Sequence, residues 1–504
     1  MLRRLAVSAW LGLALAALFF YPLAVALDTD IYYLQWQSSD TIETGAALAA
    51  LALLFGASIF GLWPRTGRGA LVALIALAAL PLTSFLAGVV RQLPFDDTLR
   101  GMAEYGVLRY GLPVAGMAMA GAGIVLVPDL FLRWFRRLLI LVSPVWLVVA
   151  QILIASFAHA DSIVSVDRAR PAAEEGAVPA PAPAGCAPVL ALLFDELSFS
   201  YLYDQDRVRQ EYPAMASLAS QATNYLAVAA PGPETLVAMP SFLSARHLRD
   251  VTATGDAVFE VDDEGRLIPF TAGRPEALFP TARRLGYTTE MAGYYLRYCE
   301  LLDGLLDRCQ SLSFYNVSSA APGFSLVDPV LTTLVLWPRQ FPFGLLKNPP
   351  FAALQRRLVE STTAFAARPL AGPRPVFRFV HFSVPHFPFV FGAGGYDPPF
   401  DPLRTSPDTQ YVGQLAYVDS LLGELVRQMR ADGTYDPTTI VVLADHGFRF
   451  GGRERDTLHI PFIVKMAGQG QAEYSSSPAR GEVLLKQVLE NSCAAPGGAT
   501  SSPR

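Results

Sequence analysis

The sequence predicts a five-helix transmembrane N-terminal domain followed by an α/β domain with a mostly parallel central sheet. Hydrophobic residues make up 52% of the 504 residues and charged residues only 16%, and the apolar excess lies almost entirely before residue 158. Two continuous apolar runs farther along, at residues 188–194 and 440–444, lack the alternation of a half-exposed strand. Such runs are typical of strands buried on both faces of a parallel sheet.

Five apolar segments, at about residues 5–27, 42–63, 70–90, 112–132 and 138–157, are the predicted spans. Each is close to the roughly 20 residues that cross about 30 Å of hydrocarbon. The first resembles a signal peptide, but no small-residue cleavage site is evident, so we expect it to be retained. Arginines at 3–4, 65–68 and 133–137 predict that these loops and the N-terminus are cytoplasmic. The chain beyond residue 157 would then lie on the periplasmic, or extracytoplasmic, side of a bacterial-type inner (cytoplasmic) membrane.

The rest of the chain divides by composition. Residues 158–187 are rich in Ala and Pro and predict an extended linker. Residues 188–490 form the predicted globular domain, and residues 491–504 a flexible tail. The four cysteines fit an oxidising compartment. Cys299 with Cys309 and Cys186 with Cys493 are plausible pairs, but four cysteines allow three connectivities. The net charge of −5 argues against a nucleic-acid partner.

Both buried runs end in metal-ligating side chains. The second run continues into Asp445, His446 and Gly447, and the first ends in Asp195 and Glu196. In open α/β sheets, ligands bind outside the carboxyl ends of the strands. Carboxylates and an imidazole brought together there would suit a divalent cation. The alternative is structural, with the acids capping helices and Gly447 supplying a positive φ in a turn.

Thr235 begins a stretch that could form a helix. One interpretation is an N-cap hydroxyl. The other is a nucleophile, since a metal-bound hydroxyl at a helix N-terminus loses its proton readily and can attack a phosphorus or sulfur centre.

Together these elements resemble the alkaline phosphatase superfamily, in its sulfatase-like branch, and within it the membrane-anchored phosphoethanolamine transferases and lipoteichoic acid synthases. The nucleophile motif of that family is a Thr followed five residues on by Pro and nine on by a small residue, which Thr235, Pro240 and Ser244 match. The resemblance implies an extracytoplasmic sulfatase-like domain. It also implies that the metal ligands are Asp195, Thr235, Asp445 and His446.

Four of the six histidines lie at motif-like positions, namely His381, His386, His446 and His459. The resemblance implies that His386 and His459 contact the substrate or a second metal, and His381 is a further candidate for substrate binding. The structural alternative is that lone histidines pack in the core. The apolar helical pattern at residues 411–429 predicts a packing helix, in which Asp419 is structural.

The chain also departs from the family. The transferases usually carry one Glu where this chain has Asp195 and Glu196, so Glu196 is an additional candidate ligand. The sulfatase signature Cys/Ser-x-Pro-x-Arg is absent, and Thr235 cannot become the formylglycine that sulfatases use.

The sequence therefore predicts a membrane-anchored, metal-dependent transferase of phosphoryl or phospho-headgroup groups, acting on an envelope lipid or glycan. The ligand set suits Zn or Mn, with Ca or Mg as alternatives. The alternative activity is a sulfatase-like hydrolase of phosphate, phosphodiester or sulfate esters. A third hypothesis is a non-catalytic partner in envelope assembly. The sequence leaves the oligomeric state open.

Overall fold

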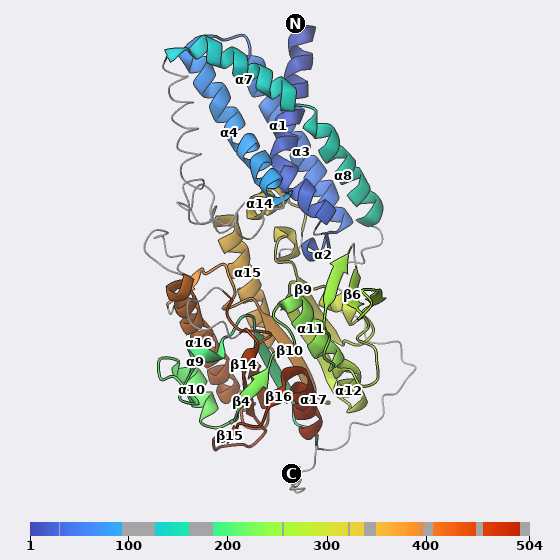
Figure 1. Cartoon of the computed structure of the whole chain (residues 1–504), viewed down its shortest axis with the longest axis vertical. Coiled ribbons are helices and arrows are strands. Elements are labelled where there is room, and N and C mark those ends of the chain that lie inside the picture. The colour runs from blue at the N-terminus through green and yellow to red at the C-terminus, as the bar shows by residue number, and fades with distance from the viewer. Residues whose placement is uncertain are drawn as a thin grey trace. The chain divides into compact units, whose positions relative to one another are not determined.

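The computed structural model describes residues 1–29, 31–92, 126–160, 185–254, 257–320, 323–336, 349–392, 394–396, 407–449 and 457–493. The chain divides into two compact units. The N-terminal unit comprises Met1–Val164 together with Tyr315–Phe351, and the α/β unit comprises Ser165–Phe314 and Ala352–Arg504. Each unit is described by itself below, with the element labels of Figure 1.

The N-terminal unit is built from long apolar helices around α1. Its helices are α1 (Leu2–Thr29), α2 (Ile31–Leu34), α3 (Ser38–Leu62), α4 (Gly67–Gln92), α7 (Pro128–Val142), α8 (Val145–Ala160), η1 (Val317–Ala320) and α14 (Asp328–Val335). Helix α1 packs against α3, α4 and α8. A Cβ on Gly12 would lie 2.4 Å from the carbonyl oxygen of Ala52. The absence of a side chain at Gly12 therefore lets α1 and α3 approach closely, as small residues do between membrane helices.

Four helices among the described residues are long and apolar enough to cross a membrane: Leu2–Asp28, Ser39–Leu62, Gly67–Phe85 and Pro128–Ala155. The first three correspond to predicted spans. The predicted span at 112–132 lies mostly outside the described residues. The predicted break at 133–137 is wrong, because α7 continues through it and only Ser143 and Pro144 separate α7 from α8.

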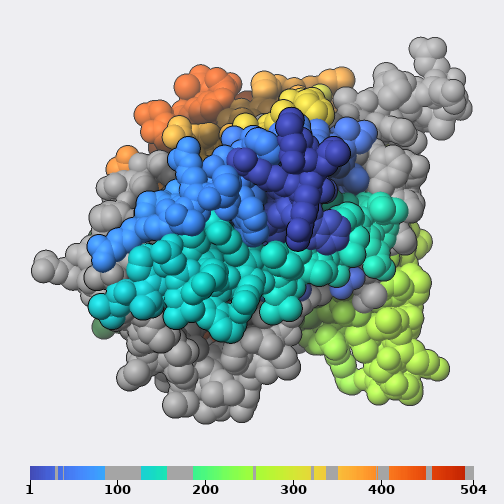
Figure 2. All heavy atoms as spheres, turned by 90° about the horizontal axis from the view of Figure 1, so that it is seen from above, coloured from blue at the N-terminus to red at the C-terminus, as the bar shows by residue number. Residues whose placement is uncertain are grey.

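Arg136 of helix α7 contacts the residues that connect α3 to α4. The Arg136 guanidinium donates to the carbonyl of Arg65 at 2.7 Å and lies over the Trp63 ring. Leu132 and Leu139 of the same helix are buried. Figure 2 shows α7, in turquoise, lying alongside the blue helices of this unit. The arginines are therefore accommodated on an amphipathic helix rather than in a loop between two spans.

The α/β unit contains a nine-stranded sheet within its described residues, in the order β15-β4-β14-β13-β1-β10-β8-β9, with β16 paired to β4. Its strands are β1 (Val189–Phe194), β4 (Thr223–Ala229), β8 (Thr288–Tyr294), β9 (Arg308–Leu312), β10 (Val376–Phe382), β13 (Thr439–Leu443), β14 (His459–Lys465), β15 (Glu473–Ser475) and β16 (Ala479–Arg480). Strand β1 pairs in parallel with β10 and β13, whereas β14 runs antiparallel to β13 and β4. The predicted mostly parallel sheet is confirmed.

Helices and smaller sheets surround this core (Figure 1). The helices are α9 (Phe199–Leu202), α10 (Pro213–Ala219), α11 (Thr235–Ser244), α12 (Leu278–Arg284), α13 (Tyr298–Leu301), α15 (Pro349–Ala366), α16 (Pro407–Ala431) and α17 (Gly481–Asn491). The smaller strands are β2 (Tyr203–Asp204), β3 (Arg207–Val208), β5 (Val251–Thr254), β6 (Ala257–Val261), β7 (Leu267–Pro269), β11 (Phe391–Gly392) and β12 (Gly395–Tyr396). On α16, the Asp419 carboxylate accepts from the backbone N–H groups of Ala214 and Met215, which confirms its structural role.

Both hypothesised disulfides are present, Cys186–Cys493 and Cys299–Cys309. The first joins the residues just before β1 and just after α17 across 307 positions of sequence. The predicted linker at 158–187 and tail at 491–504 lie largely outside the described residues.

Replacing Cys186 and Cys493 together by Ser should lower the free energy of unfolding by about 2–5 kcal/mol, because the unfolded chain regains the freedom of a long loop. Denaturant unfolding under oxidising conditions, followed by fluorescence, measures this change. The Cys299→Ser/Cys309→Ser pair is the matched control and should cost less, because its loop spans only 10 positions. An equal loss in both pairs would contradict the expectation.

Candidate metal centre and nucleophile

The site lies at the carboxyl ends of the central parallel strands. In the sheet register, Phe194 of β1 lies beside Phe382 of β10, and Leu193 lies beside Leu443 of β13. Asp195 directly follows β1, and Asp445 follows β13 by one further residue. Two residues separated by 250 positions therefore meet because their strands are neighbours.

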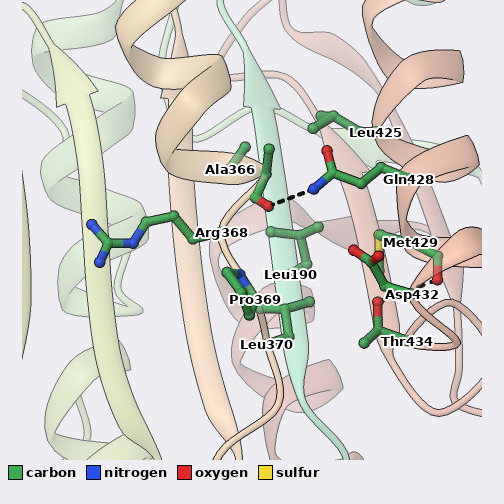
Figure 3. A pocket seen from close by; sticks show the side chains of 11 residues that line it. Leu190, Ala366, Arg368, Pro369, Leu370, Leu425, Gln428, Met429, Asp432 and Thr434 are labelled. Atoms are coloured by element: carbon green, nitrogen blue, oxygen red, sulfur yellow. Dashed lines mark hydrogen bonds between the residues drawn. The ribbon is translucent and has the colours of Figure 1, made fainter.

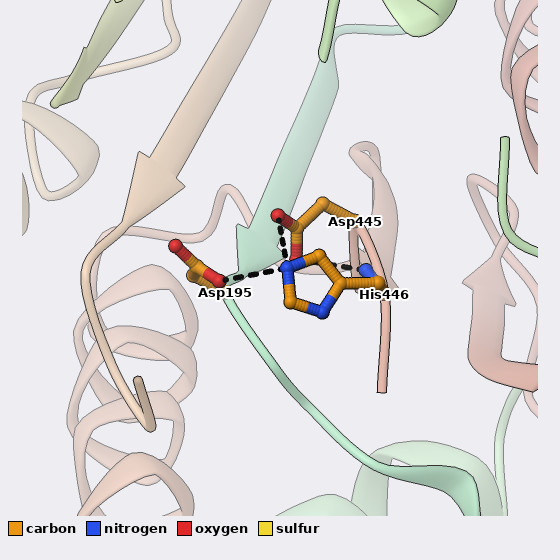
Figure 4. Close-up of side chains that lie close together, drawn as sticks. All are labelled: Asp195, Asp445 and His446. Carbon is orange, nitrogen blue, oxygen red and sulfur yellow. Dashed lines mark hydrogen bonds and ion pairs between the residues drawn. The ribbon is translucent and has the colours of Figure 1, made fainter. Parts of the chain in front are cut away.

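Asp195, Asp445 and His446 form a fully buried group whose ligand atoms all lie within 4.8 Å of one another (Figure 4). His446 Nε2 is 3.7 Å from Asp195 Oδ1 and 3.5 Å from Asp445 Oδ2. The other ring nitrogen, Nδ1, lies 3.0 Å from the carbonyl of Gly447, to which it donates. That hydrogen bond leaves Nε2 as the nitrogen available to a metal, as in histidine ligands whose second nitrogen is held by a carbonyl.

Several buried atoms here lack a hydrogen-bond partner within the described part of the chain. They include Asp195 Oδ1, His446 Nε2, His381 Nε2 and Glu196 Oε2. Buried polar atoms are normally satisfied, so a cluster of orphaned ligand atoms needs an explanation. Carboxylate oxygens and an imidazole nitrogen pointed at one small volume fit a divalent cation.

Thr235 is the first residue of α11 and is buried. Its hydroxyl donates to Asp445 Oδ2 at 2.8 Å and lies 3.4 Å from Asp195 Oδ2. The N-cap position belongs to Glu234. The N-cap interpretation of Thr235 is therefore wrong, because its hydroxyl bonds to the carboxylates.

The electrostatics of the group reflect two carboxylates in a dry environment. Burial, and then the nearby Asp195, raise the pKa of the Asp445 carboxyl. Burial alone would lower the pKa of His446, but Asp445 and Asp195 outweigh it and raise that pKa. Burial would raise the pKa of Asp195, as it does for Asp445. The nearby His386, His381 and His446 outweigh burial and hold the pKa of Asp195 below its usual range. The group therefore attracts either a proton or a metal cation.

His381 lies beside Asp195 in the interior. Its Nε2 is 3.8 Å from Asp195 Oδ2, and its Nδ1 hydrogen-bonds to the Tyr298 hydroxyl at 2.6 Å. A Cβ on Gly293 of β8 would lie 2.6 Å from the Tyr298 ring and 3.0 Å from His381 Cβ, so only glycine leaves room for this pair. The Tyr294 hydroxyl donates to Asp195 Oδ2. Substrate binding by His381 stays a prediction, and its burial favours a role in orienting Asp195.

Glu196 follows Asp195 directly and is held by two hydrogen bonds. Its φ of 63° lies in the left-handed region, and this conformation lets its backbone N–H donate to Asp445 Oδ1 at 3.1 Å. Its carboxylate Oε1 accepts from Arg449 Nε at 2.6 Å. The ligand group of Asp195, Asp445 and His446 does not include Glu196, so coordination through its Oε2 stays a prediction.

Arg449 is a functional candidate that the sequence analysis missed. Its Nη2 donates to His386 Nε2 at 3.1 Å, while His386 Nδ1 donates to the carbonyl of Phe387 at 2.5 Å. The Arg449 side chain is 33% exposed, whereas its partner Glu196 is fully buried. The available signal was its position four residues after Asp445. Arg449 and His386 are thus brought together at the accessible side of the site.

His459 begins β14, at the same edge of the sheet. Its Nε2 donates to the carbonyl of Leu226 at 2.8 Å, and its ring stacks on Phe199 at 3.9 Å. These contacts are structural, and a substrate contact by His459 stays a prediction.

A separate small pocket lies at the opposite edge of the sheet (Figure 3). It is lined by Leu190 near the start of β1, by residues 366–370 and by the end of α16, where Gln428 donates to the carbonyl of Ala367. It brings none of the candidate ligands together, and ligands of open α/β sheets bind at the other edge.

Comparison with known proteins identifies the family. Residues 188–490 match the family model described as Sulfatase. No curated protein matches the chain. Similar solved structures include Ps i-CgsB in complex with k-i-k-neocarrahexaose, with 14% identity, a TM-score of 0.41 and coverage of 62% of this chain and 74% of that one.

Two others are the phosphonate monoester hydrolase of Agrobacterium radiobacter (16% identity, TM-score 0.38, coverage 61% and 73%) and the lipoteichoic acid synthase LtaP from Listeria monocytogenes (12%, 0.38, 62% and 73%). At these scores the structural likenesses carry no argument of their own. The match to the family model covers more than half of the chain, so the chain belongs to the sulfatase family, in the alkaline phosphatase superfamily that its motifs resemble.

Proposed function

We propose that the protein is a membrane-anchored, metal-dependent transferase that passes a phosphoryl or phospho-headgroup group to an envelope lipid or glycan through Thr235. The observation that carries this proposal is the Thr235 hydroxyl, buried at the start of α11 and 2.8 Å from Asp445 Oδ2. A hydroxyl in that position has both a proton acceptor and a helix N-terminus beside it.

Asp195, Asp445, His446 and the Thr235 hydroxyl would hold the cation. When bound, a divalent metal lowers the pKa of a coordinated hydroxyl and offsets charge on a phosphoryl group. The orphaned Asp195 Oδ1 and His446 Nε2 support this assignment. The mixed oxygen and nitrogen ligands suit Zn or Mn.

The side chains of this chain supply the remaining steps. The Thr235 proton passes to Asp445, the carboxylate to which it is already bonded, as Oγ1 forms a bond to phosphorus. The bond between phosphorus and the leaving oxygen breaks, and that oxygen takes a proton from solvent, to which Asp445 returns the proton of Thr235. Backbone N–H groups at the start of α11 stabilise the charge that builds on the phosphoryl oxygens. An acceptor hydroxyl then attacks the Thr235 ester and regenerates the threonine.

Arg449 and His386 are the proposed contacts for the non-bridging oxygens of the substrate. A guanidinium binds two phosphoryl oxygens in a fork that a single ammonium cannot match. Because Arg449 also pairs with Glu196, substrate binding and the position of the Glu196 carboxylate would be linked.

The four apolar helices support a transferase that works beside lipid headgroups. The two disulfides support an oxidising compartment, and with it the periplasmic location of the α/β unit. Hydrolysis, with water as the acceptor, is the second candidate activity and uses the same residues. A non-catalytic role is disfavoured because the nucleophile and ligand positions are all filled.

Thr235→Ala should abolish a covalent adduct and lower turnover by about 10³-fold or more, because the nucleophile is removed. Intact-mass analysis of the full-length protein after exposure to native membrane lipids measures the adduct, and peptide mapping locates it. Ser244→Ala is the matched control on the same helix, since the Ser244 hydroxyl bonds to the carbonyl of Pro240. An adduct that persists in Thr235→Ala would refute the nucleophile.

A labelled headgroup that ends on lipid or glycan supports the transferase, and one that ends only in water supports the hydrolase.

Metal binding should tighten as the pH rises and should release protons. The pKa values of Asp445 and His446 are raised in the metal-free site, so both groups hold protons to higher pH and must lose them to coordinate. Titration calorimetry with Zn²⁺ or Mn²⁺ in buffers of different ionisation enthalpy measures the protons released. Asp445→Asn should remove part of this release, and a pH-independent affinity would count against the ligand set.

Arg449→Ala should lower kcat/KM by about 10- to 100-fold, mainly through KM, because a contact to the substrate oxygens is lost. Arg449→Lys should recover little of it, since Lys lacks the planar fork. Arg427→Ala is the control, because Arg427 is exposed and pairs with the exposed Glu424. Steady-state kinetics with unchanged KM in Arg449→Ala would exclude the proposed contact.

A further inference from the structure

We infer that the segment around α14 inserts Phe324, Leu326 and Val327 into the outer leaflet of the membrane as a lipid-binding surface. The inference rests on the proposed placement of the N-terminal unit in a membrane. It goes beyond that placement because the segment lies within the part of the sequence that matches the sulfatase family.

The segment packs as part of the N-terminal unit. Tyr315–Phe351 cluster with Met1–Val164, although they follow the strand β9 of the α/β unit in sequence. Helix α14 contacts α1 and α3. Leu336 is buried in a cluster with Phe20, Leu23 and Trp36, and Val330 and Leu334 pack on that cluster.

Two buried carboxylates on α3 fix the segment in place. The Asn316 amide donates to Asp40 Oδ2 at 2.9 Å, and the Ser325 backbone N–H donates to Glu43 Oε1 at 3.1 Å. Asp40 and Glu43 are only 5% and 3% exposed. Hydrogen bonds to ionised groups are among the stronger ones, particularly where water is excluded. The segment is therefore held against α3 at a defined level.

The same segment displays three large apolar side chains on its outer side. Phe324, Leu326 and Val327 are 68%, 45% and 59% exposed. Their backbone is ordered by the Ser325 hydroxyl, which accepts from the N–H groups of Val327 and Asp328. A fixed turn that presents three neighbouring apolar side chains has the character of an interaction surface.

The position along α3 identifies lipid as the occupant. Asp40 and Glu43 lie in the first two turns of α3, at the start of the stretch Ser39–Leu62 that is apolar and long enough to cross a membrane. In the proposed topology this end of α1 and α3 is the outer face, so the three side chains lie at the level of the outer leaflet.

The test measures the depth of a label at position 324. All four cysteines are paired, so Phe324→Cys in the full-length protein provides one free thiol for an environment-sensitive fluorophore. In vesicles of phosphatidylethanolamine and phosphatidylglycerol, we expect strong quenching by lipids with a spin label near the headgroup. We also expect quenching by aqueous acrylamide to be several-fold weaker than at an exposed site in water. Leu326→Cys repeats the measurement at a second position.

Two control positions distinguish a failure of this inference from a failure of the proposed membrane placement. Leu53→Cys, on α3 and 77% exposed, should report lipid, and Leu267→Cys, on β7 and 51% exposed, should report water. A label at 324 that behaves like 267 while 53 reports lipid overturns the inference and leaves the membrane placement intact. A label at 53 that reports water overturns the membrane placement itself. Protection of 324 from both quenchers means that a protein covers it, which also overturns the inference.

Discussion

The fold of the α/β unit brings two carboxylates together where water cannot reach them. Asp195 and Asp445 follow the adjacent strands β1 and β13, and both are fully buried. Like charges in such a place repel unless a cation lies between them. Three neighbouring side chains contact these carboxylates. Tyr294 and Thr235 donate hydrogen bonds to them, and the Nε2 atom of His446 lies close to them. The site is an arrangement suited to positive charge, and the proposed role of Thr235 as a nucleophile depends on it.

The buried Glu196 carboxylate forms an ion pair with the Arg449 guanidinium. A second acid beside Asp195 would raise the charge of the ligand set if it faced the cation. Its left-handed backbone instead turns the carboxylate toward a guanidinium at the accessible side. The surplus negative charge then holds Arg449 in position beside His386. Glu196 thereby connects Asp445, through its backbone N–H, to the partly exposed Arg449, through its carboxylate.

The sequence predicted those features that depend on local pattern or on strand order. The apolar runs before Asp195 and Asp445 predicted the strands β1 and β13. The rule that ligands bind at the carboxyl ends of parallel strands predicted that the two acids lie close together. Thr235 was ambiguous because a residue at a helix start can be either a cap or a nucleophile. The structure excludes the cap, because Glu234 is the N-cap residue and the Thr235 hydroxyl bonds to Asp445. The role as a nucleophile stays a prediction. The sequence did not predict that Glu196 pairs with Arg449. That contact depends on how the loop after β13 folds, and hydrophobic periodicity does not encode the fold of a loop. The division at residues 133–137 failed because arginines suggest a loop, whereas α7 accommodates them on one face.

The membership of residues 315–351 in the N-terminal unit has a consequence for biogenesis. Strands β1, β4, β8 and β9 leave the ribosome before this segment, and β10 and β13 leave after it. Yet β10 lies between β1 and β8, and β13 lies on the other side of β1. The centre of the sheet therefore closes only after the segment has been synthesised, at a time when it can already pack on α1 and α3. The ligand group can therefore form only after the segment that packs in the N-terminal unit has been synthesised.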